Sequence, residues 1–179
     1  MQKHTMDIAH QRAQSIKLVI FDVDGVMTDG SLFLDDDGHE YKAFNALDGH
    51  GLKMLKSTGV DTAIITGRSS QVVAHRAHNL GIAHVYQGVD NKLEAYLHLL
   101  EKSGLSAAQT AYMGDDVIDL PVLIRCGLAI SVPAAPAVVK QHAHLTTTLG
   151  GGRGAVREAC EFIMQAQDTY AQVIAQYLE

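Results

Sequence analysis

The chain has 179 residues, 47% of them hydrophobic, which is enough for one globular domain with its own core. Its formal net charge of −6 provides no basic surface for nucleic acid or an anionic membrane, and no apolar run approaches the roughly 18 residues of a membrane span. Cys126 and Cys160 match no disulfide or zinc pattern, and the N-terminal residues contain no signal-peptide core. We therefore expect a cytoplasmic protein that binds neither nucleic acid nor a membrane.

Patterns typical of strands and helices alternate along most of the chain. Residues 1–15 are polar and are expected to form a loose N-terminal segment. Short apolar runs predict strands over residues 17–21, 62–66, 83–86, 110–113 and 128–132. Amphipathic patterns predict helices over residues 48–58, 72–80, 92–102 and 121–125. This alternation favours an α/β core over residues 16–149, with a Rossmann-like parallel sheet and helices on both of its faces.

An inserted β-hairpin is predicted over residues 31–44. The apolar stretches Leu32-Phe33-Leu34 and Tyr41-Lys42-Ala43-Phe44 flank Asp35-Asp36-Asp37-Gly38, whose composition is typical of a turn. The apolar side chains of this hairpin are more numerous than a solvated ribbon needs. We expect the hairpin to be used for oligomerisation, with packing of the same residues on neighbouring helices as the alternative.

The last predicted region is residues 150–179, a glycine-rich segment followed by a helical tail. A helix from Ala155 onward is indicated by apolar residues at helical spacing, namely Val156, Ala159, Ile163, Ala166, Tyr170, Val173 and Tyr177. We interpret the run from Gly150 to Gly154 as a flexible joint that lets the tail move. Arg153, within this run, then provides an anion-binding group.

Two carboxylates come directly after the first predicted strand. Asp22 and Asp24 are spaced i, i+2 and precede Gly25. The carboxyl end of a parallel strand faces the crevice where open α/β sheets bind ligands, and two acids there repel each other unless a cation or a shared proton holds them. This is the chemistry of an aspartyl nucleophile with a neighbouring acid or base and a magnesium ion. The turn at residues 35–38 is equally acidic, so the pair alone is not a specific signal.

Further polar residues occupy corresponding places along the chain. Thr66 ends a strand, where its hydroxyl and nearby backbone N–H groups suit a phosphoryl group, with a simple turn as the alternative. Lys92 opens a helix and offers the cation that a phosphate site needs, although lysines in such places are usually solvated. Asp115 and Asp116 follow another strand, and burying two acids without a metal is costly. Asp119, shortly after them, is either part of this group or a helix cap.

The order Asp-x-Asp, Thr, Lys and Gly-Asp-Asp, each on its own β/α unit, resembles the four motifs of the haloacid dehalogenase superfamily of phosphohydrolases. The resemblance covers roughly residues 17–135. It implies that Asp22 is the nucleophile that becomes phosphorylated, and that Asp24 protonates the leaving oxygen and then activates water. It also implies that Thr66 and Lys92 hold the phosphoryl oxygens.

The same resemblance implies a magnesium site. Its ligands would be the side chains of Asp22 and Asp115 and the backbone carbonyl of Asp24, with Asp116 and Asp119 supporting the site from close by. Magnesium keeps several waters and takes few protein carboxylates, which agrees with this small set.

Within the superfamily, the chain is similar to the 3-deoxy-D-manno-octulosonate 8-phosphate phosphatases. The similarity lies in residues 22–30, 45–51, 64–68 and 151–158, so it spans nearly the whole chain. It implies hydrolysis of a small sugar-acid phosphate in lipopolysaccharide biosynthesis. The implied substrate contacts come from Asp24, Asn45, Ala46, Leu47, Asp48, Gly49, Lys53, Arg68, Arg76, Lys92 and Arg153. Many relatives have a basic residue in the place of Leu47, so Lys53, Arg68 or a neighbouring subunit's arginine is expected to bind the substrate carboxylate.

The resemblance also implies a homotetramer built on the hairpins, in which neighbouring subunits share active sites. Spacing independently supports the absence of a cap domain. Only about forty residues separate Asp24 from Thr66, and a hairpin and a helix occupy them. The tail of a neighbouring subunit is then expected to close the site and exclude water.

Other functions fit parts of the same pattern. A phosphatase for another 2-keto-3-deoxy sugar-acid phosphate, such as a nine-carbon one, uses the same motifs. A receiver-type signalling module also combines acids, Thr and Lys on a parallel sheet, but it has no acid two residues after its phosphorylated Asp. Asp24 in that place favours turnover over a switch. A catalytically inactive scaffold is not favoured, because every motif residue is present.

Overall fold

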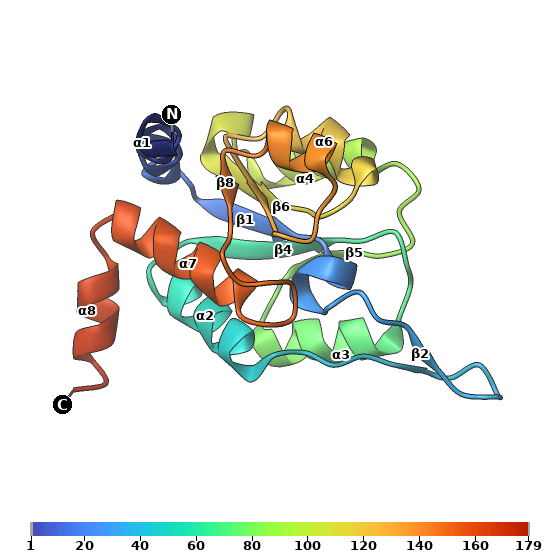
Figure 1. Ribbon diagram of the computed structural model, residues 1–179. Helices are drawn as coiled ribbons and strands as arrows, with labels where there is room; N and C mark the ends of the chain where they lie inside the picture. The colour runs from blue at the N-terminus through green and yellow to red at the C-terminus, as the bar shows by residue number, and fades with distance from the viewer. Residues whose placement is uncertain (1, 179) are drawn as a thin grey trace.

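The computed structural model describes residues 2–178 and has a six-stranded parallel sheet at its centre (Figure 1). In their order across the sheet, the strands are β5 (His84–Tyr86), β4 (Asp61–Ile65), β1 (Leu18–Phe21), β6 (Thr110–Met113), β7 (Leu128–Ser131) and β8 (Leu145–Thr146). Every neighbouring pair in this sheet is parallel. The predicted strands are therefore found within one residue of their expected bounds. The short strand β8 is not among the predicted strands, because a strand of two residues is too short to show a pattern in the sequence.

Helices cover both faces of this sheet, as the alternating pattern predicts. In Figure 1, α4 (Lys92–Ser103) and α6 (Ala137–His142) lie above the sheet, and α2 (Ala46–Ser57), α3 (Gln71–Leu80) and α7 (Ala155–Ala166) lie below it. The short helix α5 (Leu120–Leu123) comes between β6 and β7. The β1 side chains Val19, Ile20 and Phe21 are fully buried between the layers. Among the described residues, no helix is both long and apolar enough to cross a membrane.

The N-terminal segment forms a helix from Gln2 to Ala13, α1, so the expectation of a loose segment is wrong there. Ala9 and Ala13 are fully buried, and the Arg12 guanidinium donates a hydrogen bond to the Gly127 carbonyl at 2.7 Å. The polar composition conceals this packing, because small alanines provide the buried positions. α1 contacts α7, β7 and β8 and so belongs to the body of the molecule.

The predicted hairpin is present and projects from the body of the molecule (Figure 1). Its strands, β2 (Phe33–Leu34) and β3 (Glu40–Tyr41), have two residues each and are shorter than expected. Four of its apolar side chains are between 51% and 61% exposed: Leu32, Phe33, Leu34 and Tyr41. Phe44, in contrast, packs against the core, and the Arg76 guanidinium lies 5.6 Å from the centre of its ring. Packing on the helices therefore applies to Phe44, whereas the outer residues face away from the body.

The glycine-rich segment is packed tightly onto the body of the molecule. The Gly152 N–H donates to the Val26 carbonyl at 3.0 Å, and a Cβ on Gly151 would lie 1.8 Å from the carbonyl oxygen of Gly25. These glycines therefore permit a close backbone approach to η1 (Val23–Met27), the turn that follows β1. The structure thus gives Gly151 and Gly152 a packing role that the interpretation as a flexible joint does not include.

The tail forms two helices instead of one. The chain turns at Asp168, whose φ of 56° lies in the left-handed region, and α8 (Tyr170–Ala175) then lies at the edge of the molecule in Figure 1. α7 packs along α2 and buries Ala155, Val156, Ala159, Cys160, Ile163 and Met164. The first helix of the expected tail is therefore part of the core.

Candidate active site

Three predicted site residues meet at the carboxyl edge of the sheet. Asp22 and Thr66 directly follow β1 and β4, and Asp115 follows β6 after Gly114. Because β1 is hydrogen-bonded to both β4 and β6, these strand ends lie side by side. All three residues line a crevice of about 170 Å³. The other residues that line it are Asp24, Gly67, Arg68, Asp116 and Ile118.

Lys92 lies under this crevice and joins two carboxylates. Its Nζ lies 2.8 Å from Asp22 Oδ2 and 2.7 Å from Asp119 Oδ1. The Lys92 side chain is 2% exposed, so the alternative of a solvated lysine is wrong. Burial alone lowers the pKa of Lys92, but the charges of Asp22 and Asp119 more than offset this and raise it above its ordinary value. The ammonium thus stays charged, and these carboxylates need only two of its three N–H donors.

Asp119 organises this corner of the site. It is fully buried, and its Oδ1 accepts hydrogen bonds from Lys92 Nζ and from the Tyr112 hydroxyl, both at 2.7 Å. Its Oδ2 accepts the backbone N–H groups of Asp115 and Asp116 at 3.0 and 3.1 Å. Asp119 therefore caps the short 3₁₀ turn that follows Asp116 and also anchors Lys92. The two roles that the sequence leaves open are combined in one side chain.

The acidic cluster at the crevice fits a divalent metal ion. Carboxylate oxygens of Asp22, Asp115 and Asp119 lie within 4.8 Å of one another. Burial, together with the charges of Asp22 and Asp119, raises the pKa of Asp115 to about 7. A divalent cation would let these carboxylates ionise together, and magnesium prefers hard carboxylate oxygens. Each oxygen of Asp119 already accepts two hydrogen bonds, whereas each oxygen of Asp22 has one such partner, so Asp22 and Asp115 are the side chains more available as ligands.

Asp24 lies on the η1 turn, and two basic side chains approach its carboxylate. Lys42 Nζ lies 2.5 Å from Asp24 Oδ1, and Arg68 Nε lies 3.8 Å from Asp24 Oδ2. Glu40 bridges the two cations, because its Oε1 lies 3.1 Å from both Lys42 Nζ and Arg68 Nη2. Lys42 and Glu40 are absent from the set predicted from sequence. The signal that points to them is their i, i+2 spacing in an extended segment, which places both side chains on one side.

A second pocket, of about 210 Å³, holds other residues expected to bind substrate. The residues that line it are Ala46, Gly49, His50, Lys53, Arg76 and Leu80. Arg76 donates a hydrogen bond to the Asn45 carbonyl at 3.2 Å. The Asn45 side chain caps α2 by accepting the backbone N–H groups of Leu47 and Asp48. Within one chain, the structure therefore keeps this pocket separate from the Asp22 crevice.

Asp48 caps α7 from its position on α2. One of its oxygens accepts the Arg157 N–H at 2.8 Å, and the other accepts the Gly154 N–H at 3.3 Å. The side chain is buried, and burial is the main reason that the pKa of Asp48 is raised. Both Asp48 oxygens thus hold the start of α7, and the expected contact between Asp48 and substrate stays a prediction.

Leu47 and Arg153 line a third pocket, of about 400 Å³. The Leu47 side chain is exposed and gives this pocket an apolar wall. Arg153 is also exposed, and its Nη2 lies 3.1 Å from Asp29 Oδ2. One chain thus distributes the residues expected to bind substrate over three separate places.

Known proteins match the chain over most of its length. A family model for haloacid dehalogenase-like hydrolases matches residues 38–127. The 3-deoxy-D-manno-octulosonate 8-phosphate phosphatase of Yersinia pestis is 48% identical over 158 residues, which are 88% of this chain and 84% of the relative. The family model includes Thr66, Lys92, Asp115 and Asp119 and begins after Asp22 and Asp24.

Two solved structures share the fold at similar identity. A probable YrbI family phosphatase from Pseudomonas syringae has a TM-score of 0.95 and 48% identity, and the match covers 97% of this chain and 98% of that one. The 3-deoxy-D-manno-octulosonate 8-phosphate phosphatase from Moraxella catarrhalis, in complex with magnesium, phosphate and a KDO molecule, has a TM-score of 0.94 and 44% identity, and covers 96% and 99%. The chain therefore belongs to the 3-deoxy-D-manno-octulosonate 8-phosphate phosphatase family of haloacid dehalogenase-like hydrolases.

Proposed function

We propose that this protein is a magnesium-dependent phosphatase that converts 3-deoxy-D-manno-octulosonate 8-phosphate to 3-deoxy-D-manno-octulosonate and phosphate in lipopolysaccharide biosynthesis. The observation that carries the proposal is the crevice in which Asp22, Asp24 and Asp115 meet above the buried Lys92. The Moraxella relative, with its magnesium, phosphate and KDO, supports the choice of substrate and metal. Both cysteines are buried and unpaired, which supports a reducing compartment such as the cytoplasm.

The first half of the proposed reaction transfers the phosphoryl group to Asp22. A carboxylate oxygen of Asp22 attacks phosphorus, and the bond between phosphorus and the sugar oxygen breaks. Asp24 gives a proton to the departing oxygen, so the sugar acid leaves as an alcohol. Lys92 and Thr66 bind the phosphoryl oxygens, where the ammonium stabilises the negative charge of the transition state.

The second half restores Asp22. Asp24, now ionised, takes a proton from a water molecule, whose oxygen attacks phosphorus as the bond to Asp22 breaks and inorganic phosphate forms. Magnesium, held by the side chains of Asp22 and Asp115 and the carbonyl of Asp24, would neutralise negative charge on the reacting oxygens. Asp119 keeps Lys92 in place, and Asp116 supports the loop that carries Asp115.

We also propose that the active protein is a homotetramer in which hairpins pair subunits and active sites are shared. The exposed apolar residues at the hairpin favour burial against another copy, since strand edges and apolar patches of this kind form symmetric contacts. The basic pocket of Lys53 and Arg76 would then face a neighbour's crevice and bind the substrate carboxylate together with Arg68. An active monomer in dilute solution, measured by sedimentation, would contradict this assembly.

The substrate and the metal are tested together by measuring kcat/KM over a panel of sugar-acid phosphates. We expect the eight-carbon acid to be preferred, chelation to abolish turnover and added magnesium to restore it. A preference for a nine-carbon acid phosphate would identify that compound as the substrate instead. A stable phospho-Asp22 without turnover of any ester would indicate a signalling module instead.

A further inference from the structure

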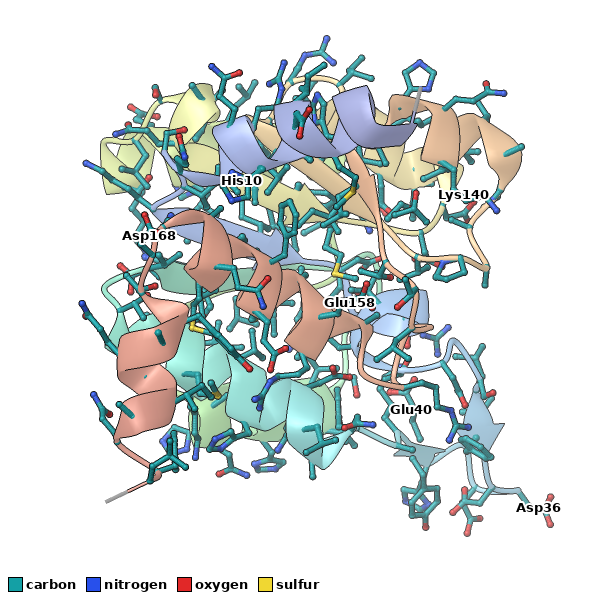
Figure 2. The ribbon with its side chains drawn as sticks, turned by 60° about the vertical axis from the view of Figure 1, so that its left-hand side comes forward. His10, Asp36, Glu40, Lys140, Glu158 and Asp168 are labelled. Carbon is teal, nitrogen blue, oxygen red and sulfur yellow. The ribbon has the colours of Figure 1, made fainter. Side chains whose placement is uncertain are left out.

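The hairpin reaches the candidate active site through its inner end. Figure 2 shows Glu40 next to the body of the molecule and Asp36 at the far tip. Lys42 comes just after β3, and its side chain is 1% exposed, whereas Phe33 and Tyr41 are more than half exposed. One end of the hairpin is thus buried at the site while the rest projects from it.

The buried ammonium of Lys42 has two carboxylate partners. Lys42 Nζ lies 2.5 Å from Asp24 Oδ1 and 3.1 Å from Glu40 Oε1. An ammonium that has been removed from water needs such partners, because an isolated buried charge is costly. Glu40 therefore holds Lys42 in place, and Lys42 in turn holds the Asp24 carboxylate.

The contact with Lys42 determines which oxygen of Asp24 is available for chemistry. Lys42 occupies Oδ1, so Oδ2 is the oxygen on the side of Arg68, which lines the crevice. Arg68 is 48% exposed and 3.8 Å away, and such a pair in contact with solvent is weak. The backbone of Asp24 is not helical, with φ −74° and ψ 121°, and Gly25 follows it at φ 85°. Among the described residues, Lys42 is the buried cation that fixes this carboxylate.

We propose that Lys42 is a positioning residue for Asp24, orienting its carboxylate toward the reacting oxygen while Glu40 holds the ammonium. This role rests on the proposed phosphatase function, in which Asp24 gives a proton to the sugar oxygen and then takes one from water. Lys42 contacts neither reacting atom. Its removal therefore slows the steps that use Asp24 and spares the attack of Asp22 on a substrate whose leaving group needs no proton.

The experiment compares the full-length wild type with Lys42→Met, which keeps an apolar stem, and Lys42→Arg, which keeps the charge. The substrates are 3-deoxy-D-manno-octulosonate 8-phosphate, whose leaving alkoxide needs a proton, and p-nitrophenyl phosphate, whose leaving phenolate does not. In Lys42→Met, kcat for the sugar-acid phosphate is expected to fall by about 10- to 100-fold, with KM changing less than about threefold. Lys42→Arg is expected to recover part of the loss.

Rapid mixing with p-nitrophenyl phosphate separates positioning from general damage. Lys42→Met is expected to release one equivalent of nitrophenolate at close to the wild-type rate and then turn over slowly, with phosphate trapped on Asp22 after acid quenching. Lys102→Met, at an exposed position near the end of α4, is the matched control and is expected to behave as wild type.

An unchanged kcat in Lys42→Met would overturn the positioning role, and so would a nitrophenolate burst that slows as much as turnover does. If Lys42→Met does not fold, the double variant Glu40→Gln/Lys42→Met also removes the charge of Glu40, one of the two carboxylates that lose the Lys42 ammonium, and allows the same measurement. A wild-type protein that releases phosphate from neither substrate would refute the proposed function instead. The two failures are therefore distinguishable.

Discussion

Two acidic clusters in this chain have similar composition and opposite surroundings. The hairpin cluster consists of Asp35, Asp37 and His39, and the crevice cluster consists of Asp22, Asp115 and Asp119. In each cluster, potential ligand atoms lie within 4.8 Å of one another. The hairpin cluster is exposed, whereas two members of the crevice cluster are buried. The spacing of the acids therefore does not separate a turn from a site.

Burial and hydrogen bonding separate the two clusters. In the hairpin, Asp35 Oδ1 accepts the N–H groups of Asp37 and His39 at 3.0 and 2.8 Å, and the bond from the His39 backbone is the main reason that the pKa of Asp35 is lowered. In the crevice, burial and neighbouring carboxylates raise the pKa of Asp115 to about 7. An acidic cluster thus becomes a candidate metal site when burial leaves its negative charge in excess of the cation beside it, here Lys92.

The largest expected difference between the clusters follows removal of one carboxylate from each. Asp22→Asn should lower kcat by up to about a millionfold, the scale for losing a nucleophile, and should leave no acid-stable phosphate on the protein. Asp37→Asn should keep the wild-type kcat. Steady-state kinetics and acid quenching check both variants. Equal, mild losses in the two variants would remove the distinction between the clusters.

A smaller effect is expected from removing the basic partner of each cluster. Lys92→Met should lower kcat/KM by about 10²- to 10³-fold, by analogy with one lost oxyanion donor, because its charge no longer stabilises the phosphoryl oxygens. His39→Gln, in the hairpin, should leave kcat/KM unchanged. If kcat/KM of Lys92→Met were close to that of the wild type, Lys92 would serve only as a structural counter-charge to the buried carboxylates.

The smallest expected effect is a metal-dependent change in thermal stability. Magnesium at a hundredfold excess over its Kd should raise the Tm of the wild type by about 5–10 °C, because it binds only the folded crevice. Asp115→Asn should lose this shift, and Asp35→Asn should keep it. Differential scanning fluorimetry with and without a chelator provides the measurement. If Asp35→Asn lost the Tm shift and Asp115→Asn kept it, the metal site would lie in the hairpin instead.

The sheet and the centre of the crevice are predictable because they depend on local patterns. Each buried strand is a short apolar run that ends in a polar or glycine residue, and parallel strands bring such ends together. Asp22, Thr66 and Asp115 are found together for this reason. Asp48 is not predictable in this way, because its partner is the N–H of Arg157, 109 residues further along the chain.

Local sequence patterns do not predict the role of a residue when that role depends on one particular tertiary neighbour. A lysine next to an exposed hairpin and a run of glycines are both typical of solvated, flexible segments. In the structure, Lys42 contacts Asp24 and Gly151 packs on Gly25, so both serve the same η1 turn. Composition predicts what these residues are able to do, whereas the packing of distant segments decides what they do.

The packing of Gly151 and Gly152 on the η1 turn has a consequence for biosynthesis. The ribosome makes the nucleophile and its turn well before it makes Gly151 and Gly152, the backbone that braces this turn. A nascent chain that ends before Gly150 already contains Asp22, Asp24, Thr66, Lys92 and Asp115. It still lacks the brace and the helix that Asp48 caps. A chain stalled at that point therefore holds every reactive group without the packing that braces the η1 turn.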